Sequence, residues 1–177
     1  GGRKDVEDIW YSDLDTVTGI WNEAINAGAP LNNKGPNFIC SITPRNYYYD
    51  ILLGNAYRNN KMTAGLSIAS RFESGYTEPV RVIIENDENL SPHANYYLAN
   101  NEQAILMSVH RRGGYGDRDL YVTFIQPNGR WSTPLNLGDV INTSEAEASP
   151  YLALDNKTLY FSSEGHLGYG GEDIFIS

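Results

Sequence analysis

The sequence predicts an all-β fold of the β-propeller type, and three observations support this prediction. The 177-residue chain repeats itself with a period of about 55 residues, and short apolar segments with strand-like alternation lie between glycine-rich turns. No stretch carries a convincing helical stripe with caps. Four short strands in each tandem repeat are typical of propeller blades, so we expect about three four-stranded antiparallel blades and one additional N-terminal strand.

Two sets of residues mark the repeat, and we interpret both as structural positions. An aromatic residue that follows a turn glycine recurs at Trp21, Tyr76 and Trp131. An aspartate followed by an apolar and then an aromatic residue recurs at Asp8, Asp119 and Asp173. A further aspartate expected near residue 65 is missing, so the first full repeat is degenerate.

The repeat divides the chain into four parts. Residues 1–15 are expected to hold the last strand of a preceding blade, and residues 20–70, 75–125 and 130–177 are expected to form one blade each. The predicted strands are 76–83, 95–99, 104–108 and 119–124 in the second repeat, and 131–137, 149–154, 158–163 and 173–176 in the third. Both ends fall at the same point of the repeat, which predicts a segment of a longer propeller. Closure of three blades by self-association is the alternative.

An excess of acidic residues limits the classes of partner. The 22 acidic and 13 basic side chains give a formal charge of -9, so no nucleic-acid partner is expected. The apolar stretches are too short for a direct membrane span. The one cysteine, Cys40, cannot form a disulfide within the chain, and we interpret it as a small core residue.

The third repeat carries the most specific phrases, which are Trp131–Gly138, Asp155–Ser163, Gly165-His166 and Gly168–Phe175. This repeat resembles the WD40-like (PD40, TolB-type) repeat of bacterial envelope propellers. It is most similar to the propeller of OmpA-like, peptidoglycan-associated outer-membrane proteins, some of which are linked to the type IX secretion system. The likeness is strong over residues 131–177, moderate over 76–130 and weak over 20–70.

The resemblance implies a place in the Gram-negative cell envelope. It predicts a periplasmic, outer-membrane-associated scaffold without catalysis, which mediates protein–protein interaction. The expected partner is a periplasmic or outer-membrane protein, with contact to peptidoglycan through a flanking domain. No cofactor is expected.

The patterns that could carry catalysis or bind a metal are weak. The repeated aspartates could be calcium ligands, but an aspartate after a tight turn can instead accept N–H bonds from that turn, and its recurrence favours architecture. No Gly-x-Ser-x-Gly elbow occurs. A carboxylate pair drawn from Glu85 or Asp87 with Glu145 or Glu147 has nothing to distinguish it from surface acids. We therefore expect neither an enzyme nor a metal site.

Blade topology predicts one chemically rich face. The loops around residues 85–88 and 145–147 leave the blades on the same side as the loops around 110–112 and 166–169. Acidic, basic and aromatic side chains together suit a protein-recognition surface. The candidate partner-binding residues are His110, Arg111, Arg112, Tyr115, His166, Tyr169, Glu145 and Glu147. A carbohydrate- or peptidoglycan-binding propeller and a propeller glycan hydrolase stay open as alternatives.

Overall fold

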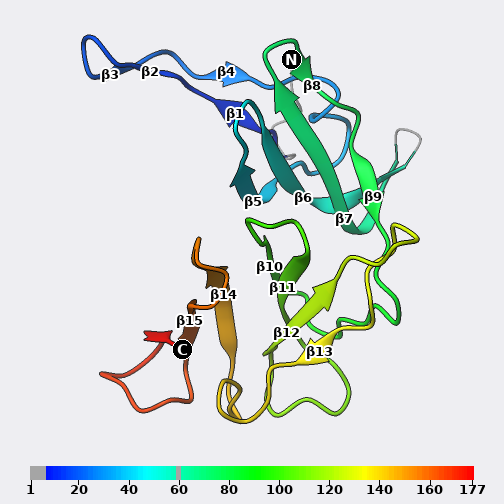
Figure 1. The fold of residues 1–177 in the computed structure, drawn as a ribbon, viewed down its shortest axis with the longest axis vertical. Coiled ribbons are helices and arrows are strands. Elements are labelled where there is room, and N and C mark those ends of the chain that lie inside the picture. The colour runs from blue at the N-terminus through cyan, green and yellow to red at the C-terminus, as the bar shows by residue number, and fades with distance from the viewer. Residues whose placement is uncertain (1–6, 59–60) are drawn as a thin grey trace. The chain divides into compact units, whose positions relative to one another are not determined.

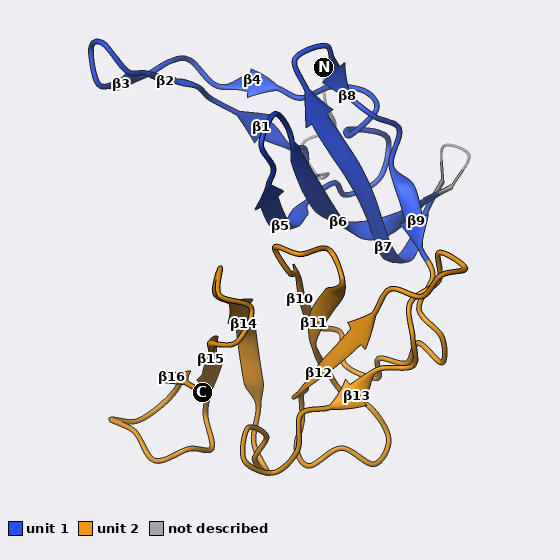
Figure 2. Ribbon diagram, viewed as in Figure 1, with its two compact units in different colours: residues 1–82 blue, residues 83–177 orange. Residues whose placement is uncertain are grey.

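The computed structural model describes residues 7–58 and 61–177, and the regular structure among them consists of β-strands (Figure 1). Residues 1–6, which the sequence assigns to the end of a preceding blade, lie outside the described residues. The chain forms two compact units, residues 1–82 and residues 83–177 (Figure 2). The prediction of an all-β fold is confirmed.

Unit 1 contains a ribbon and a sheet. In the ribbon, β1 (Trp10–Tyr11) pairs with β4 (Ile25–Asn26), and β2 (Leu14–Asp15) pairs with β3 (Ile20–Trp21), so the chain runs out and back as a long hairpin (Figure 1). The antiparallel sheet has the order β5-β6-β7-β8, and β9 also pairs with β7. Its strands are β5 (Ile39–Pro44), β6 (Tyr49–Arg58), β7 (Lys61–Phe72), β8 (Gly75–Tyr76) and β9 (Val80–Val82).

Unit 2 contains two antiparallel sheets, with the strand orders β10-β11-β12-β13 and β14-β15-β16. Each is a meander in which strands that follow one another in sequence are neighbours in the sheet. The first sheet consists of β10 (Asn95–Leu98), β11 (Ala104–Val109), β12 (Asp119–Phe124) and β13 (Leu135–Asn136). The second consists of β14 (Glu147–Leu152), β15 (Leu159–Ser163) and β16 (Asp173–Ile176).

The repeat boundaries predicted from the sequence are displaced by one strand. Val122 pairs with Leu135 and Tyr121 with Asn136, so the predicted strand 131–137 completes the sheet of the second repeat instead of opening the third. The predicted strand 76–83 is likewise two short strands, β8 and β9, and both pair with β7. At most ten residues separate each of these strands from the strand with which it pairs, and antiparallel pairing across such a connection needs little loop-closure entropy.

The three aromatic repeat markers lie at the same place in the pairing. Each pairs with a residue in or next to the preceding strand, across a turn with a positive-φ glycine; the pairs are Trp21 with Leu14, Tyr76 with Arg71 and Trp131 with Ile125. Their burial differs, because Trp131 is 4% exposed and Trp21 is 65% exposed. The three aromatic residues therefore correspond in strand pairing, but they do not all lie in the core.

Corresponding residues build the core of each unit. In unit 2, Leu120, Ile141 and Phe161 belong to one apolar cluster, which joins the two sheets. In unit 1, residues about 110 positions earlier do the same, because Ile9, Leu31 and Ile51 join the ribbon to the sheet. The repeated sequence thus produces repeated packing within each unit.

Candidate functional site

Neighbouring loops of unit 2 are fixed to one another by backbone hydrogen bonds. The Leu90 N–H donates to the His110 carbonyl at 2.9 Å, the Asp117 N–H to the Glu145 carbonyl at 3.1 Å, and the Glu164 N–H to the Ala146 carbonyl at 3.0 Å. We call the loops 84–94, 110–118, 137–146 and 164–172 the loop-end surface. The last three lie at the lower end of unit 2 in Figure 2.

Two arginines join the first two of these loops. The Arg111 guanidinium donates to the Asn86 carbonyl at 3.0 Å and lies 5.5 Å from the centre of the Tyr121 ring. Arg112 forms an ion pair with the Glu88 carboxylate at 3.0 Å. The Arg111 guanidinium therefore binds groups of unit 2 itself. The Arg112 side chain is 80% exposed and can contact a partner.

The repeated aspartates shape two of the loops. Each carboxylate accepts two N–H bonds from the glycine-containing loop just before it, which is the turn-holding role that the sequence predicted. A side chain at Gly114 or Gly168 would collide with the carboxylate, which explains the glycine at both places. The donors are Tyr115 and Gly116 for Asp119, at 2.6 and 2.9 Å, and Tyr169 and Gly170 for Asp173, at 2.7 and 3.2 Å.

Two asparagines complete this arrangement, and sequence reasoning missed them. In unit 2 the Asn136 amide donates to Asp119 at 3.0 Å. The Asn142 amide accepts from the Leu120 N–H at 2.7 Å, and it donates to the Leu120 carbonyl at 3.0 Å and to Asn136 at 2.8 Å. One buried side-chain amide thus satisfies the Leu120 N–H and shares the Leu120 carbonyl with the N–H of Leu137.

Unit 1 contains a corresponding set of hydrogen bonds. The Asn26 amide donates to Asp8 at 3.1 Å. The Asn32 amide accepts from the Ile9 N–H and donates to the Ile9 carbonyl, both at 2.8 Å. We call each set, Asp8/Asn26/Asn32 and Asp119/Asn136/Asn142, an Asp–Asn–Asn latch. The spacing of six residues between the asparagines, with a glycine two positions after the first, is the signal in the sequence that could have revealed it.

Glu147 is not a surface residue, which corrects its predicted partner-binding role. Its side chain is fully buried. The carboxylate accepts from the Thr143 hydroxyl at 2.6 Å, the Thr143 N–H at 3.0 Å and the Ser163 hydroxyl at 2.8 Å. Such a satisfied buried acid holds loop 137–146 in place, and it cannot form a solvent-exposed catalytic pair with Glu85 or Asp87.

The two loop histidines differ in their surroundings. The His166 ring lies against Phe161 and Phe175, and its Nε2 bonds the Ile141 carbonyl at 2.9 Å. His166 therefore has a structural role in the half-buried part of the unit. The His110 ring is 39% exposed, with Nδ1 3.5 Å from the Asp117 carboxylate, and it stays within reach of a partner.

The exposed side chains of the loop-end surface are aromatic and aliphatic as well as charged. Tyr169 and Leu167 are fully exposed, Val140 is 78% exposed and Tyr115 is 53% exposed. Glu145 is also exposed. Leu167 and Val140 were missed from the sequence, because an apolar residue in a loop cannot be distinguished from a core residue without its burial.

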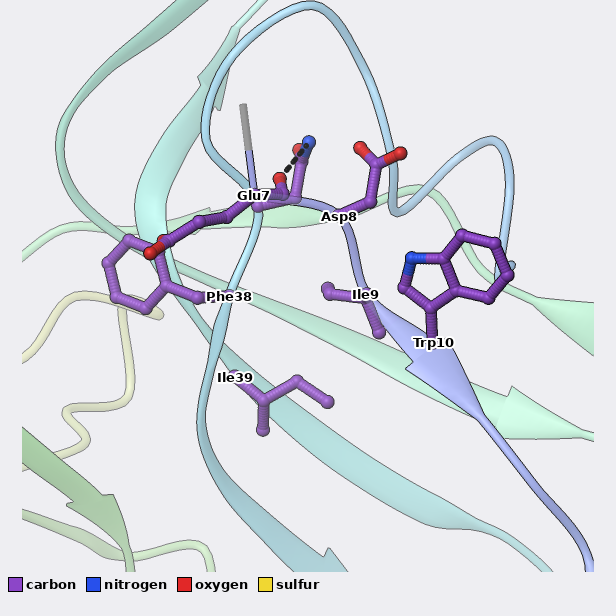
Figure 3. Close-up of a pocket in the computed structure, with 7 residues that line it drawn as sticks. Glu7, Asp8, Ile9, Trp10, Phe38 and Ile39 are labelled. Atoms are coloured by element: carbon purple, nitrogen blue, oxygen red, sulfur yellow. Dashed lines mark hydrogen bonds between the residues drawn. The ribbon is translucent and has the colours of Figure 1, made fainter. Parts of the chain in front are cut away.

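Unit 1 contains a shallow, open hollow of different character (Figure 3). Trp10, Phe38 and Ile39 line it together with Glu7 and Asp8. The two acidic side chains extend in different directions in Figure 3, and Asp8 is bonded to Asn26. The hollow therefore offers an indole and a phenyl ring beside acids, but no converging carboxylate pair of the kind that glycoside hydrolysis uses.

Within residues 7–58 and 61–177, no group of three or more His, Cys, Asp and Glu side chains is placed to share a metal ion. These residues also include no helix with the length and apolar character needed to cross a membrane. Cys40 is half-buried, and burial raises the pKa of its thiol to about 12, which makes it a poor nucleophile.

Comparison of the chain with models of protein families, with curated proteins and with solved structures gives no match in any of the three.

Proposed function

We propose that this chain is part of a β-propeller scaffold of the Gram-negative cell envelope that docks a periplasmic or outer-membrane protein and has no catalytic activity of its own. The observation that carries the docking role is the loop-end surface. Tyr115, Leu167 and Tyr169 project from loops whose backbones are bonded to their neighbours, so little ordering entropy is lost on binding. Exposed aromatic side chains on a rigid support are typical anchors of protein interfaces.

Charge defines the chemistry of the partner. Acids outnumber arginines in the four loops, with Glu85, Asp87, Glu88, Asp117, Asp139, Glu145, Glu164 and Glu172 against Arg111, Arg112 and Arg118. A partner face with Lys or Arg around an apolar centre complements this pattern. The whole chain carries a formal charge of -9, which adds long-range attraction to a basic partner.

The propeller and the envelope location have separate support. Successive antiparallel meanders, which pack through corresponding core residues within each unit, support the propeller. The periplasmic location, the link to peptidoglycan and the type IX secretion role are supported by the sequence resemblance, which is strongest over residues 131–177.

Alanine substitution of the exposed anchors tests the docking role. Cells of the source organism would carry a tagged protein with Tyr115→Ala, Leu167→Ala and Tyr169→Ala together, and a matched control would carry Val17→Ala and Tyr47→Ala, which are also highly exposed. We expect an envelope protein to co-purify with the unchanged chain and with the control. Its recovery should fall at least tenfold with the triple variant only. Equal recovery from all three proteins, with unchanged melting temperatures, would overturn the proposal.

A glycan-binding function is the second candidate, and the hollow of Figure 3 favours it. An exposed indole beside the Glu7 and Asp8 carboxylates is a surface on which a sugar ring can stack and form hydrogen bonds. Soluble peptidoglycan fragments would then shift the indole N–H resonance of Trp10 but not that of buried Trp131. If the Trp10 resonance does not shift at millimolar concentrations of the fragments, this candidate is excluded. Turnover of a glycan would support the hydrolase alternative.

A further inference from the structure

A pocket of about 410 Å³ lies within unit 1, between the loop that follows β4 and the segment that joins β8 to β9. Pro30, Asn32 and Asn33 line it from the loop, Glu78 and Pro79 line it from the segment, and Tyr57 lines it from β6. The pocket shares no residue with the hollow of Figure 3. Its volume is sufficient for a small ligand or for a long side chain of another protein.

The corresponding place in unit 2 is joined by hydrogen bonds. The residue two positions after the aromatic repeat marker is Glu78 in unit 1 and Thr133 in unit 2. In unit 2 the facing loop is the one that follows β9. Its Asn86 amide donates to the Thr133 hydroxyl at 2.9 Å, and its Glu85 N–H donates to the Trp131 carbonyl at 2.9 Å. The loop and the segment are therefore in contact in unit 2, whereas the pocket separates them in unit 1.

The loop of unit 1 has no side chain that can donate to Glu78 as Asn86 donates to Thr133. Ala29 and Pro30, which form its part of the pocket wall together with two asparagines, have no polar side-chain atom. The amides of those asparagines, Asn32 and Asn33, are already bonded to other groups of unit 1. A donor for Glu78 must therefore come from a ligand.

Glu78 is the charged residue of the pocket wall, and its side chain is open to solvent. Its carboxylate forms no hydrogen bond or ion pair with any other residue of the segments 7–58 and 61–177. An ionised carboxylate only accepts hydrogen bonds, so the group that binds it must be a donor. The formal charge of -9 on the chain favours a cationic donor over a neutral one.

The rest of the wall suits an aliphatic stem behind that cation. Pro30 and Pro79 are half-buried and present only carbon atoms in their side chains. The Tyr57 hydroxyl is bonded to the Leu31 carbonyl at 2.6 Å, so the part of Tyr57 that remains for a ligand is its ring. A lysine side chain combines a stem of this kind with a terminal ammonium group.

We propose that this pocket binds an alkylammonium group, with the ammonium at the Glu78 carboxylate and the aliphatic stem against Pro30, Pro79 and Tyr57. The ammonium supplies the donor that Asn86 supplies to Thr133 in unit 2. A lysine side chain of a partner protein and a free diamine share this chemistry. The site is separate from the loop-end surface and does not rest on its function.

Two matched probes test the role of the ammonium. N-acetyl-lysine methylamide carries it, and N-acetyl-norleucine methylamide has the same stem without it. Titrated at low salt into the isotope-labelled 177-residue chain, the lysine compound should shift the amide resonances of Glu78 and Asn33. Its Kd should be millimolar and about fivefold lower than that of the norleucine compound. Equal affinities of the two compounds, or no shift with millimolar lysine compound, would overturn the proposal.

Two variants of the chain locate the site. Glu78→Gln keeps the size of the side chain and removes its charge, so it should weaken binding of the lysine compound about fivefold. Glu73→Gln removes the same charge from an exposed position between β7 and β8, and it should leave binding unchanged. Equal effects of the two substitutions would show attraction to the overall charge of the chain and would contradict the site.

The same titration with 1,5-diaminopentane distinguishes the two sources of the ammonium. Binding that is tighter than that of the lysine compound and is weakened by Glu78→Gln assigns the pocket to a free diamine. Weaker binding of the diamine assigns the pocket to a lysine side chain. Diamine binding that Glu78→Gln leaves unchanged would contradict the proposed contact.

Discussion

Buried polar side chains determine where the loops of both units lie. Glu147 in unit 2 and Asn37 in unit 1 are each almost completely buried, and each accepts an N–H bond from the residue four positions earlier, Thr143 or Asn33. A glutamate in unit 2 and an asparagine in unit 1 thus have the same role at corresponding positions. A carboxylate that accepts three bonds is stable at such a site because its charge is shared among the donors.

Replacement of Glu147 by alanine should therefore destabilise unit 2. The change leaves the Thr143 and Ser163 hydroxyls and the Thr143 N–H without their acceptor in a buried site, at an expected loss of about 2–4 kcal/mol in the free energy of unfolding. Glu145→Ala is the matched control, because Glu145 is exposed, and its effect should stay within about 0.5 kcal/mol. Urea denaturation measures both, and similar values would contradict the assigned role of Glu147.

Cys40 should react slowly with alkylating reagents. Burial raises the pKa of its thiol to about 12, so almost none of the reactive thiolate is present at pH 8. Iodoacetamide should modify the folded chain at least a hundredfold more slowly than the urea-unfolded chain, as measured by intact mass over time. Rapid modification of the folded chain would show that β5 opens readily.

At the scale of the strands, the Asp–Asn–Asn latch joins β4 to β1 in the ribbon of unit 1 and β13 to β12 in the first sheet of unit 2. The short strands β4 and β13 have few backbone ladder bonds of their own. Side-chain amides that imitate a strand compensate for this shortage.

Asn142→Ala should cost unit 2 about 1–3 kcal/mol, because it leaves the buried N–H of Leu120 unpaired, while the Leu120 carbonyl keeps its bond from the Leu137 N–H. Asn32→Ala likewise leaves the Ile9 N–H unpaired, while the Ile9 carbonyl keeps its bond from the Ala27 N–H, and it should destabilise unit 1 by a similar amount. Asn22→Ala, at an exposed position of the ribbon, is the control and should have little effect. Hydrogen exchange of the strands should assign each loss to its own unit, and a loss from the control of equal size would argue against the latch.

The sequence patterns predicted the positions of the strands better than they predicted which strands pair with one another. The predicted strands 119–124 and 173–176 agree with β12 and β16 at both ends, because a tight glycine loop and an aspartate mark where each begins. The sheet to which residues 131–137 belong was predicted wrongly, since alternation reveals a strand but not its neighbour. The burial of Glu147 was also missed, because the sequence places this acid in a predicted loop, where it resembles a surface residue.

For the whole molecule, ionisation of half-buried tyrosines limits stability in alkali. Burial raises the pKa of Tyr57 and of Tyr76 to about 12, above the ordinary value of about 10. Both groups keep their proton in the folded chain and lose it on unfolding between these values, so the stability that they contribute is complete below pH 10 and falls as the pH rises toward 12. The melting temperature should decline over this range. The melting temperature of the Tyr57→Phe variant should decline less steeply with pH. If it declines as steeply as that of the unchanged chain, the raised pKa of Tyr57 is contradicted.

The central claim, that the loop-end surface docks a partner protein, is tested most directly by photocrosslinking in living cells. A photoreactive benzoylphenylalanine would replace Tyr169, and in a matched protein it would replace Tyr47, which is 91% exposed in unit 1. The account predicts one discrete protein adduct from position 169, reduced by Tyr115→Ala with Leu167→Ala, and no such adduct from position 47. Identical adducts from both positions, or none from position 169 while the chain remains folded, would contradict it.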